Sequence, residues 1–340
     1  MSPCAHDTAA SAMIEVRDLA RHYTMQAGLM DRLRGRQPLR LRAVDGVSFD
    51  LAPGEVLGLV GESGCGKSTT GRLLVGLEEP AAGSVRIGSE DAMALRRTDR
   101  RAFHRRVQMV FQDPYGSLNP YLTISEIIAR PLIYQGHKRG PDLYARVTVA
   151  LEQAGLTPAA QFLTRHPHQL SGGQRQRVCI ARAIVLDPSV LVADEPISML
   201  DVSIKWGIIR LLKRLVAERN ISLLYITHDL ATVGAICDRI AIMYLGRIVE
   251  IGPVDQVLAA PRHPYTAALV SAIPVAVPGG KRPPPEISGA IPDAAQIPPG
   301  CRFAPRCPRA SDLCRSTEPT MTGSSRWHVA CHHPATGATA

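Results

Sequence analysis

The chain has 340 residues, enough for one large domain and a smaller one. Hydrophobic residues make up 45% of it and charged residues 20%, a balance that supplies a sizeable core and excludes wholesale disorder. The net charge of +9 favours an anionic partner, such as a nucleic acid, a nucleotide or an anionic membrane surface. No apolar run approaches the roughly 18 residues that span a bilayer, and residues 1–8 lack the pattern of a signal peptide. We therefore expect a protein that stays in the cytosol.

Short apolar runs alternate with helical patterns between residues 13 and 262, which is typical of a parallel α/β sheet. Four of these runs predict strands, at residues 56–60, 107–111, 190–193 and 221–227. Each run is unbroken, as expected for a strand that is covered on both faces. Ligands of open α/β sheets lie beyond the carboxyl ends of the strands. The residues that follow these four runs should therefore converge on one site.

A glycine-rich loop follows the first run and fits the pattern of a loop that binds nucleotide phosphates. Its glycines let backbone N–H groups surround phosphates, and the helix predicted from about Lys67 adds its positive N-terminal end. Lys67 is expected to reach the β- and γ-phosphates, and the Ser68 hydroxyl to bind Mg²⁺. The alternative is a glycine-rich turn without a ligand. The expected nucleotide contacts from this region are Gly61, Glu62, Ser63, Gly64, Cys65, Gly66, Lys67, Ser68 and Thr69.

One residue of this loop is a cysteine. Cys65 lies beside the predicted helix N-terminus, whose positive end should favour the thiolate. We therefore expect alkylation of Cys65 to block nucleotide binding. The alternative is an inert position that only fills space.

Two acidic residues end the run at 190–193. Asp194 suits a contact to Mg²⁺, and Glu195 could polarise an attacking water as a general base. The alternative is a pair of solvated acids at a strand end.

A pair of glycines begins another predicted helix. Ser171 is a natural N-cap, and Gly172 and Gly173 expose N–H groups that could bind a second anion. The alternative is an ordinary capped helix start.

Taken in order, these motifs resemble the ABC-type ATPases. Residues 170–174 are similar to the family's signature motif, and Gln112, residues 198–201 and His228 are similar to its Q-loop glutamine, D-loop and switch histidine. The resemblance implies an α/β P-loop NTPase core of the RecA-like type, with an antiparallel β subdomain. It also implies an α-helical subdomain at about residues 113–175 and a small Cys-containing C-terminal extension.

The resemblance also implies roles for individual residues, with ATP and Mg²⁺ as cofactors. The residues expected to be catalytic are Glu195, His228 and Gln112. Those expected to contact magnesium are Ser68, Gln112 and Asp194. Further residues expected to contact the nucleotide are Tyr23, Gln112, Asp194, Ser171, Gly172, Gly173, Gln174 and Asp201. Tyr23 is placed to stack on adenine, and the signature residues are expected to cover ATP bound to a second, facing ATPase.

A narrower resemblance, to the oligopeptide/dipeptide importer branch, is carried by residues 60–68, 111–120, 243–246 and 263–266 and by the cysteine-bearing tail. It implies a subunit that hydrolyses ATP to energise import of dipeptides or oligopeptides across the bacterial inner membrane. Its implied partners are a second ABC ATPase (a homologue or a copy), two membrane permeases and a periplasmic or extracellular substrate-binding protein. It implies a peripheral place on the cytoplasmic face of that membrane, with no nucleic acid bound.

Other functions remain open at this point. The basic charge fits a soluble ABC-type ATPase that handles nucleic acid, although such proteins usually carry two cassettes or long coiled-coil insertions. Importers of nickel, opines or glutathione share the branch, and the cargo is chosen by other subunits. In the D-loop, Met199 replaces the small residue that is usual in this branch, which leaves the packing against the second ATPase open.

The C-terminal extension is expected at residues 263–340. Residues 274–300 contain eight Pro and four Gly and predict an extended linker. Four cysteines follow within a short segment, at Cys301, Cys307, Cys314 and Cys331.

Four thiolates can hold either Zn²⁺ or an iron–sulfur cluster. Structural zinc usually uses closely spaced cysteine pairs, which this segment lacks, so the spacing favours a cluster. The resemblance associates such tails with a four-iron, four-sulfur cluster of structural role. Zinc stays possible because His328, His332 and His333 could serve as ligands. Plain reduced thiols are the third possibility.

Overall fold

The computed structural model describes residues 12–24, 40–273, 287, 292, 297–324 and 326–335. Most of the linker predicted at 274–300 lies outside the described residues. Among the residues that are described, every helix is too short or too polar to cross a bilayer.

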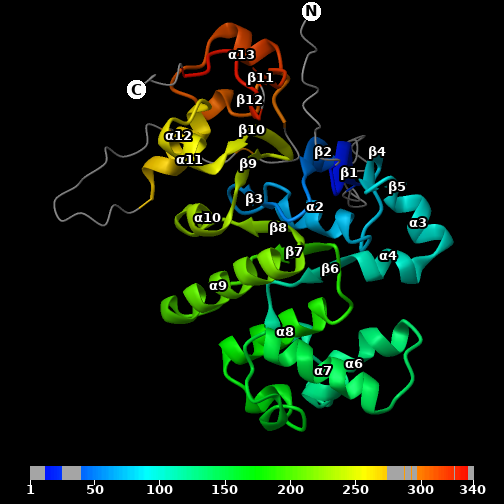
Figure 1. Cartoon of the computed structure of the whole chain (residues 1–340). Helices are drawn as coiled ribbons and strands as arrows, with labels where there is room; N and C mark the ends of the chain where they lie inside the picture. The colour runs from blue at the N-terminus through cyan, green and yellow to red at the C-terminus, as the bar shows by residue number, and fades with distance from the viewer. Residues whose placement is uncertain are drawn as a thin grey trace, which may run out of the picture.

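An eight-stranded sheet forms the centre of the molecule, with the order β11-β12-β10-β9-β3-β8-β7-β6 (Figure 1). Its strands are β3 (Val56–Val60), β6 (Val107–Val110), β7 (Val190–Asp194), β8 (Ser222–Thr227), β9 (Arg239–Tyr244), β10 (Arg247–Pro253), β11 (Thr322–Ser324) and β12 (Trp327–Val329). The four strands predicted from apolar runs are confirmed as β3, β6, β7 and β8, and they pair in parallel. All residues of β3, β7 and β8 are buried, because helices α8, α9 and α10 cover one face of the sheet, and α2 with the antiparallel sheet covers the other.

The register of these strands brings their carboxyl ends level. Val60 of β3 pairs with Thr227 of β8, and Asp194 of β7 pairs with Ile226 of the same strand. Val110 of β6 pairs with Ala193. The segments that follow the four strands therefore leave the sheet at one edge, as the sequence predicts.

A separate antiparallel sheet lies beside the core, with the order β2-β1-β4-β5. It is built from β1 (Ile14–Thr24), β2 (Arg40–Leu51), β4 (Ala82–Ile87) and β5 (Glu90–Asp91). Its inner face packs onto the core sheet through one buried cluster that includes Val16, Val47 and Leu59. This is the expected antiparallel β subdomain.

The helices divide into three groups. Around the two sheets lie α2 (Lys67–Leu74), α3 (Ala92–Thr98), α4 (Arg100–Arg106), α9 (Val202–Arg219), α10 (Leu230–Ile236) and α11 (Val254–Ala259). The expected helical subdomain contains α5 (Pro114–Ser117), α6 (Ile124–Tyr134), α7 (Pro141–Gln153) and α8 (Gly172–Ile184), at the lower end of the molecule in Figure 1. The third group, α12 (Pro264–Ser271) and α13 (Asp312–Ser316), belongs to the C-terminal extension.

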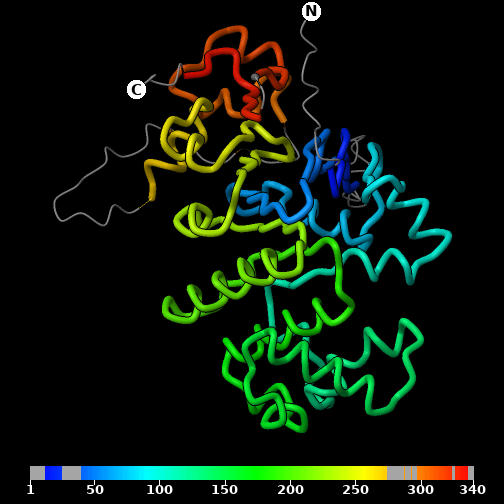
Figure 2. Tube along the Cα trace, in the orientation of Figure 1, coloured from blue at the N-terminus to red at the C-terminus, as the bar shows by residue number. Residues whose placement is uncertain are grey.

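The C-terminal extension joins the core sheet and does not form a separate body. Its strand β12 pairs antiparallel with β10, and the tube in Figure 2 shows the extension at the opposite end of the molecule from the helical subdomain. Phe303, only 1% exposed, packs its ring against Tyr244 of β9 and Tyr265 of α12, with ring centres 5.4 and 5.5 Å away. The extension is therefore docked through an aromatic cluster.

We predict that Phe303→Ala lowers the free energy of unfolding by about 3 kcal/mol, because a fully buried ring is lost and a cavity remains. Equilibrium urea unfolding followed by circular dichroism would measure this. The matched control is Leu313→Ala in the same extension, whose side chain is 50% exposed, with an expected change below about 0.5 kcal/mol. An equal effect of the two substitutions would contradict the docking role of Phe303.

Candidate functional site

The glycine-rich loop lies between β3 and α2. Gly66 is the N-cap of α2 and has φ of 108°, and a Cβ atom there would lie 2.0 Å from the carbonyl oxygen of Ala43. Only glycine fits this position. Lys67 is 5% exposed, and its Nζ donates to the carbonyl oxygens of Gly61 and Glu62 at 2.8 and 2.9 Å. The ammonium group therefore lies across the loop itself.

Two of the three predicted magnesium residues, Ser68 and Asp194, are in contact beside this loop, whereas the Gln112 amide is bonded to Glu195. Ser68 Oγ donates to Asp194 Oδ1 at 3.0 Å. Burial raises the pKa of Asp194, and the hydrogen bond from Ser68 opposes that shift. A hydroxyl and a carboxylate in contact are the hard oxygen donors that Mg²⁺ prefers. The donor set therefore fits the ion at the predicted place.

Glu195 lies at the centre of three strand ends. Its carboxylate accepts hydrogen bonds from Gln112 Nε2 at 2.9 Å and, on the other oxygen, from His228 Nδ1 at 3.0 Å. Its backbone φ is 45°, in the left-handed region that non-glycine residues seldom adopt, and its N–H donates to Ile226 O at 2.9 Å. Such strain is typical of residues whose position matters for function. The structure thus brings together all three residues predicted to be catalytic.

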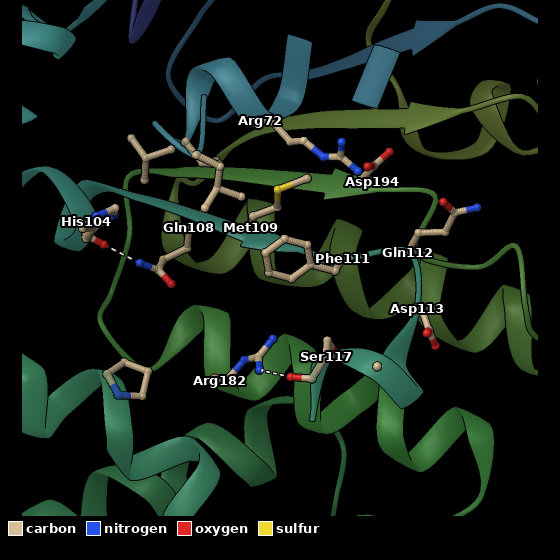
Figure 3. Close-up of a pocket in the computed structure, with 15 residues that line it drawn as sticks. Arg72, His104, Gln108, Met109, Phe111, Gln112, Asp113, Ser117, Arg182 and Asp194 are labelled. Atoms are coloured by element: carbon tan, nitrogen blue, oxygen red, sulfur yellow. Dashed lines mark hydrogen bonds between the residues drawn. The ribbon is translucent and has the colours of Figure 1, made fainter. Parts of the chain in front are cut away.

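A cavity of about 620 Å³ opens beside these residues, between the core sheet and the helical subdomain. Figure 3 shows that Gln112 and Asp194 line one end of it, with the Arg72 guanidinium near the Asp194 carboxylate. Arg72 was not predicted from the sequence. The one sequence feature that could have indicated Arg72 is its position on the helix after the loop. In a chain with 39 Lys and Arg, that position alone does not single it out.

Tyr23 lies near the end of β1, and its hydroxyl donates to Glu78. Burial and the Glu78 carboxylate raise its pKa, while a contact with Thr69 of α2 opposes that shift. The Arg21 guanidinium lies 4.9 Å from the centre of the Tyr23 ring. Tyr23 is thus beside the first turn of α2, and its stacking on adenine stays a prediction.

The signature residues lie apart from the phosphate loop of the same chain. Ser171 caps α8 in a reciprocal pair with Gln174, whose Oε1 accepts from the Ser171 N–H at 3.0 Å. Gly173 packs against Ile204, and Asp201 is the N-cap of α9. Within the described part of the chain, no hydrogen bond or ion pair joins residues 171–174 to the loop.

The expectation of a thiolate at Cys65 is wrong. Its side chain is 2% exposed, and burial raises the pKa of the thiol above its usual range although Lys67 is nearby. The sulfur lies behind the loop, against Gly61. Desolvation outweighs the helix terminus here, so Cys65 is the space-filling residue of the alternative interpretation.

The four tail cysteines line one small cavity, together with His263, His332 and His333. Their thiols are free, and burial raises the pKa of Cys301 to about 11. Across the described ranges, no group of three or more His, Cys, Asp or Glu is arranged to hold a metal ion. His328 lies elsewhere, on β12 beside β10.

Comparisons with known proteins identify the family of the chain. The chain matches the ABC transporter family over residues 44–198 and the C-terminal region of the oligopeptide/dipeptide transporters over residues 249–314.

Two relatives resemble nearly the whole chain. The di/tripeptide transport ATP-binding protein DppF of Pseudomonas aeruginosa is 42% identical, covering 94% of this chain and 97% of its own. The oligopeptide transport ATP-binding protein OppF of Salmonella typhimurium is also 42% identical, and the match covers 94% of this chain and 95% of OppF.

Solved structures agree as well. The ATP-binding cassette MJ0796, in a dimer bound to ADP and phosphate, matches with a TM-score of 0.61 and 29% identity, over 71% of this chain and 99% of its own. The cbiO1 subunit of Clostridium perfringens has a TM-score of 0.61 and 26% identity, and the match covers 73% of this chain and 91% of the cbiO1 chain. The nucleotide loop, the strand-end residues and these matches together show that the chain belongs to the ABC transporter family, as an ATP-binding and ATP-hydrolysing subunit of the oligopeptide/dipeptide transporter branch.

Proposed function

We propose that this chain hydrolyses ATP to energise the import of dipeptides or oligopeptides across the bacterial inner membrane. One observation carries the proposal. The chain that brings Gln112, Glu195 and His228 together also contains a region, 249–314, that matches the oligopeptide/dipeptide transporters. The names of DppF and OppF, which describe peptide transport, support the choice of cargo.

In this proposal the loop residues bind the phosphates. Lys67 exchanges its bonds to the Gly61 and Glu62 carbonyls for a phosphate oxygen, and backbone N–H groups at the start of α2 surround the others. Ser68 and Asp194 hold Mg²⁺, which when bound neutralises phosphate charge.

Glu195 is the general base. It orients a water and accepts its proton once the carboxylate exchanges one of its present hydrogen bonds for that water. His228 and Gln112 fix the two carboxylate oxygens from neighbouring strand ends, so that the base is already oriented. Gln112 also lines the cavity toward the helical subdomain and can respond to the γ-phosphate.

A second ATPase completes the site in this proposal. Its signature motif covers the ATP of this chain, and Ser171, Gly172 and Gly173 of this chain do the same in return. Near this face Met199 and Val202 are 55% and 72% exposed. Burial against the partner would remove this apolar surface from water.

The remaining partners are two membrane permeases and a substrate-binding protein, with the chain peripheral on the cytoplasmic side of the membrane. The helical subdomain provides the permease contact in this proposal. We take residues 13–262 as the ATPase domain and 263–340 as the extension.

We further propose that Cys301, Cys307, Cys314 and Cys331 hold a four-iron, four-sulfur cluster that orders the extension. All four line one cavity, which supports a shared ligand. The cavity volume is only about 10 Å³, so the thiols would move apart on binding. Zinc is the competing ligand.

We expect Glu195→Gln to lower ATP turnover by about 10²–10⁴-fold, because the base is lost. MgATP binding should persist and trap the paired ATPases, which size-exclusion chromatography would detect. The control is Glu218→Gln, the same change at a glutamate whose side chain is 60% exposed on α9, and its turnover should equal that of the wild type. Wild-type turnover in Glu195→Gln would exclude Glu195 as the base.

The choice of function is tested by co-purification. The tagged chain, extracted with a mild detergent from its own cells, should bring down two integral membrane proteins and a second ATPase. If nucleic acid co-purifies with the chain and no membrane subunit does, the proposed function is wrong and the alternative, an ATPase that handles nucleic acid, is favoured.

The tail ligand is tested by anaerobic purification, followed by metal analysis and visible absorbance. We expect about four irons and four sulfides per chain, lost in Cys314→Ser and kept in Cys237→Ala, a cysteine remote from the cavity. A measured content of one zinc per chain would show that the tail ligand is zinc and not a cluster. Metal-free protein with four titrating tail thiols would overturn any metal site.

A further inference from the structure

Glu62, the second residue of the phosphate loop, is bound at three points. Its carboxylate accepts two hydrogen bonds from Arg306, Nη1 to Oε2 at 3.0 Å and Nη2 to Oε1 at 3.2 Å. Its N–H donates to the Tyr265 hydroxyl at 3.0 Å, and its carbonyl oxygen accepts from Lys67 at 2.9 Å. Only Lys67 belongs to the ATPase core. Arg306 and Tyr265 come from two separate elements of the C-terminal extension.

Arg306 is held firmly in place. It ends the short 3₁₀ helix Ala304–Arg306 and is 8% exposed. Phe303, directly before that helix, is the docked ring of the aromatic cluster. Nη1 of Arg306 also lies 3.5 Å from the Tyr244 hydroxyl. Burial by itself lowers the pKa of Arg306, but the hydrogen bonds and charge of Glu62 raise it overall, so the guanidinium stays charged.

The charge of Glu62 poses a problem for the loop. ATP brings several negative charges, and a carboxylate in the loop that surrounds them repels them at short range. A bidentate guanidinium cancels the carboxylate charge and also fixes its direction. No other charged group of the described residues forms an ion pair with Glu62.

We propose that Arg306 is a positioning residue of the ATP site, which neutralises Glu62 and holds it away from the bound phosphates. The C-terminal extension is then part of the nucleotide site and not only a docking element. This inference rests on the proposed function of the loop as the ATP site.

The test is the dissociation constant of MgATP, measured by displacement of a fluorescent nucleotide from the full chain. Arg306→Met should weaken binding about tenfold, because the Glu62 carboxylate is left unpaired beside the phosphates. Adding Glu62→Gln to Arg306→Met should recover most of the loss, because the unpaired charge is then gone. Arg306→Lys, which keeps the positive charge, should stay within about threefold of the wild type.

The control is Arg315→Met, a second arginine of the extension, whose side chain is 66% exposed and pairs with Asp312 of its own helix. It should bind MgATP as the wild type does. A purely structural role for Arg306 predicts no recovery in the double variant, since Glu62→Gln removes a further contact. Wild-type binding by Arg306→Met, or a double variant no better than the single one, would overturn the inference.

Lys67→Ala separates this outcome from failure of the proposed function. If Lys67→Ala binds MgATP normally, the loop is not the ATP site and the proposed function fails. If Lys67→Ala loses MgATP and Arg306→Met does not, only the inference about Arg306 fails.

Discussion

The whole site depends on the register of four parallel strands. Because side chains alternate across a sheet, a slip of one residue would turn each buried side chain to the opposite face. Strands β3, β7 and β8 are buried along their whole length, so a slip would rearrange packing on both faces. The register that results puts Val60 beside Thr227 and Asp194 beside Ile226. The positions of the site residues at the sheet edge are therefore set by the packing of the buried strand residues that precede them.

A second constraint joins the C-terminal extension to that edge. Glu250 of β10 is fully buried and accepts three hydrogen bonds at 2.9 Å, from the N–H groups of Arg262 and His263 and from the Trp327 indole. It thereby fixes the start of α12 and the strand β12 together. His263 continues the chain of contacts, since its Nδ1 accepts from the Tyr265 N–H at 3.0 Å. A buried carboxylate is tolerated there because both of its oxygens accept hydrogen bonds, and it aligns the extension with the phosphate loop.

Sequence patterns predicted what depends on local chemistry. Unbroken apolar runs identified four strands within a residue of their observed ends, and Ser171 as a natural N-cap marked the start of α8. Patterns failed where tertiary burial decides the outcome. The helix terminus beside Cys65 was visible in the sequence, but the packing that desolvates its thiol was not. Arg306 and Glu62 are 244 positions apart, and no spacing rule connects an arginine of a cysteine-bearing tail with a residue of the phosphate loop.

The distribution of the site over the chain supports the proposal that two copies or homologues enclose each nucleotide. The phosphate loop, Asp194, Glu195 and His228 all leave the same sheet edge, whereas Ser171 begins a helix of the other subdomain. Both α2 and α8 present N–H groups of a helix start, and each is a favourable end for phosphate oxygens. In the proposed function these two ends face one phosphate from two different chains. ATP would then join the two ATPases while its γ-phosphate is present, and hydrolysis with Glu195 as base would remove the group that both helix ends share.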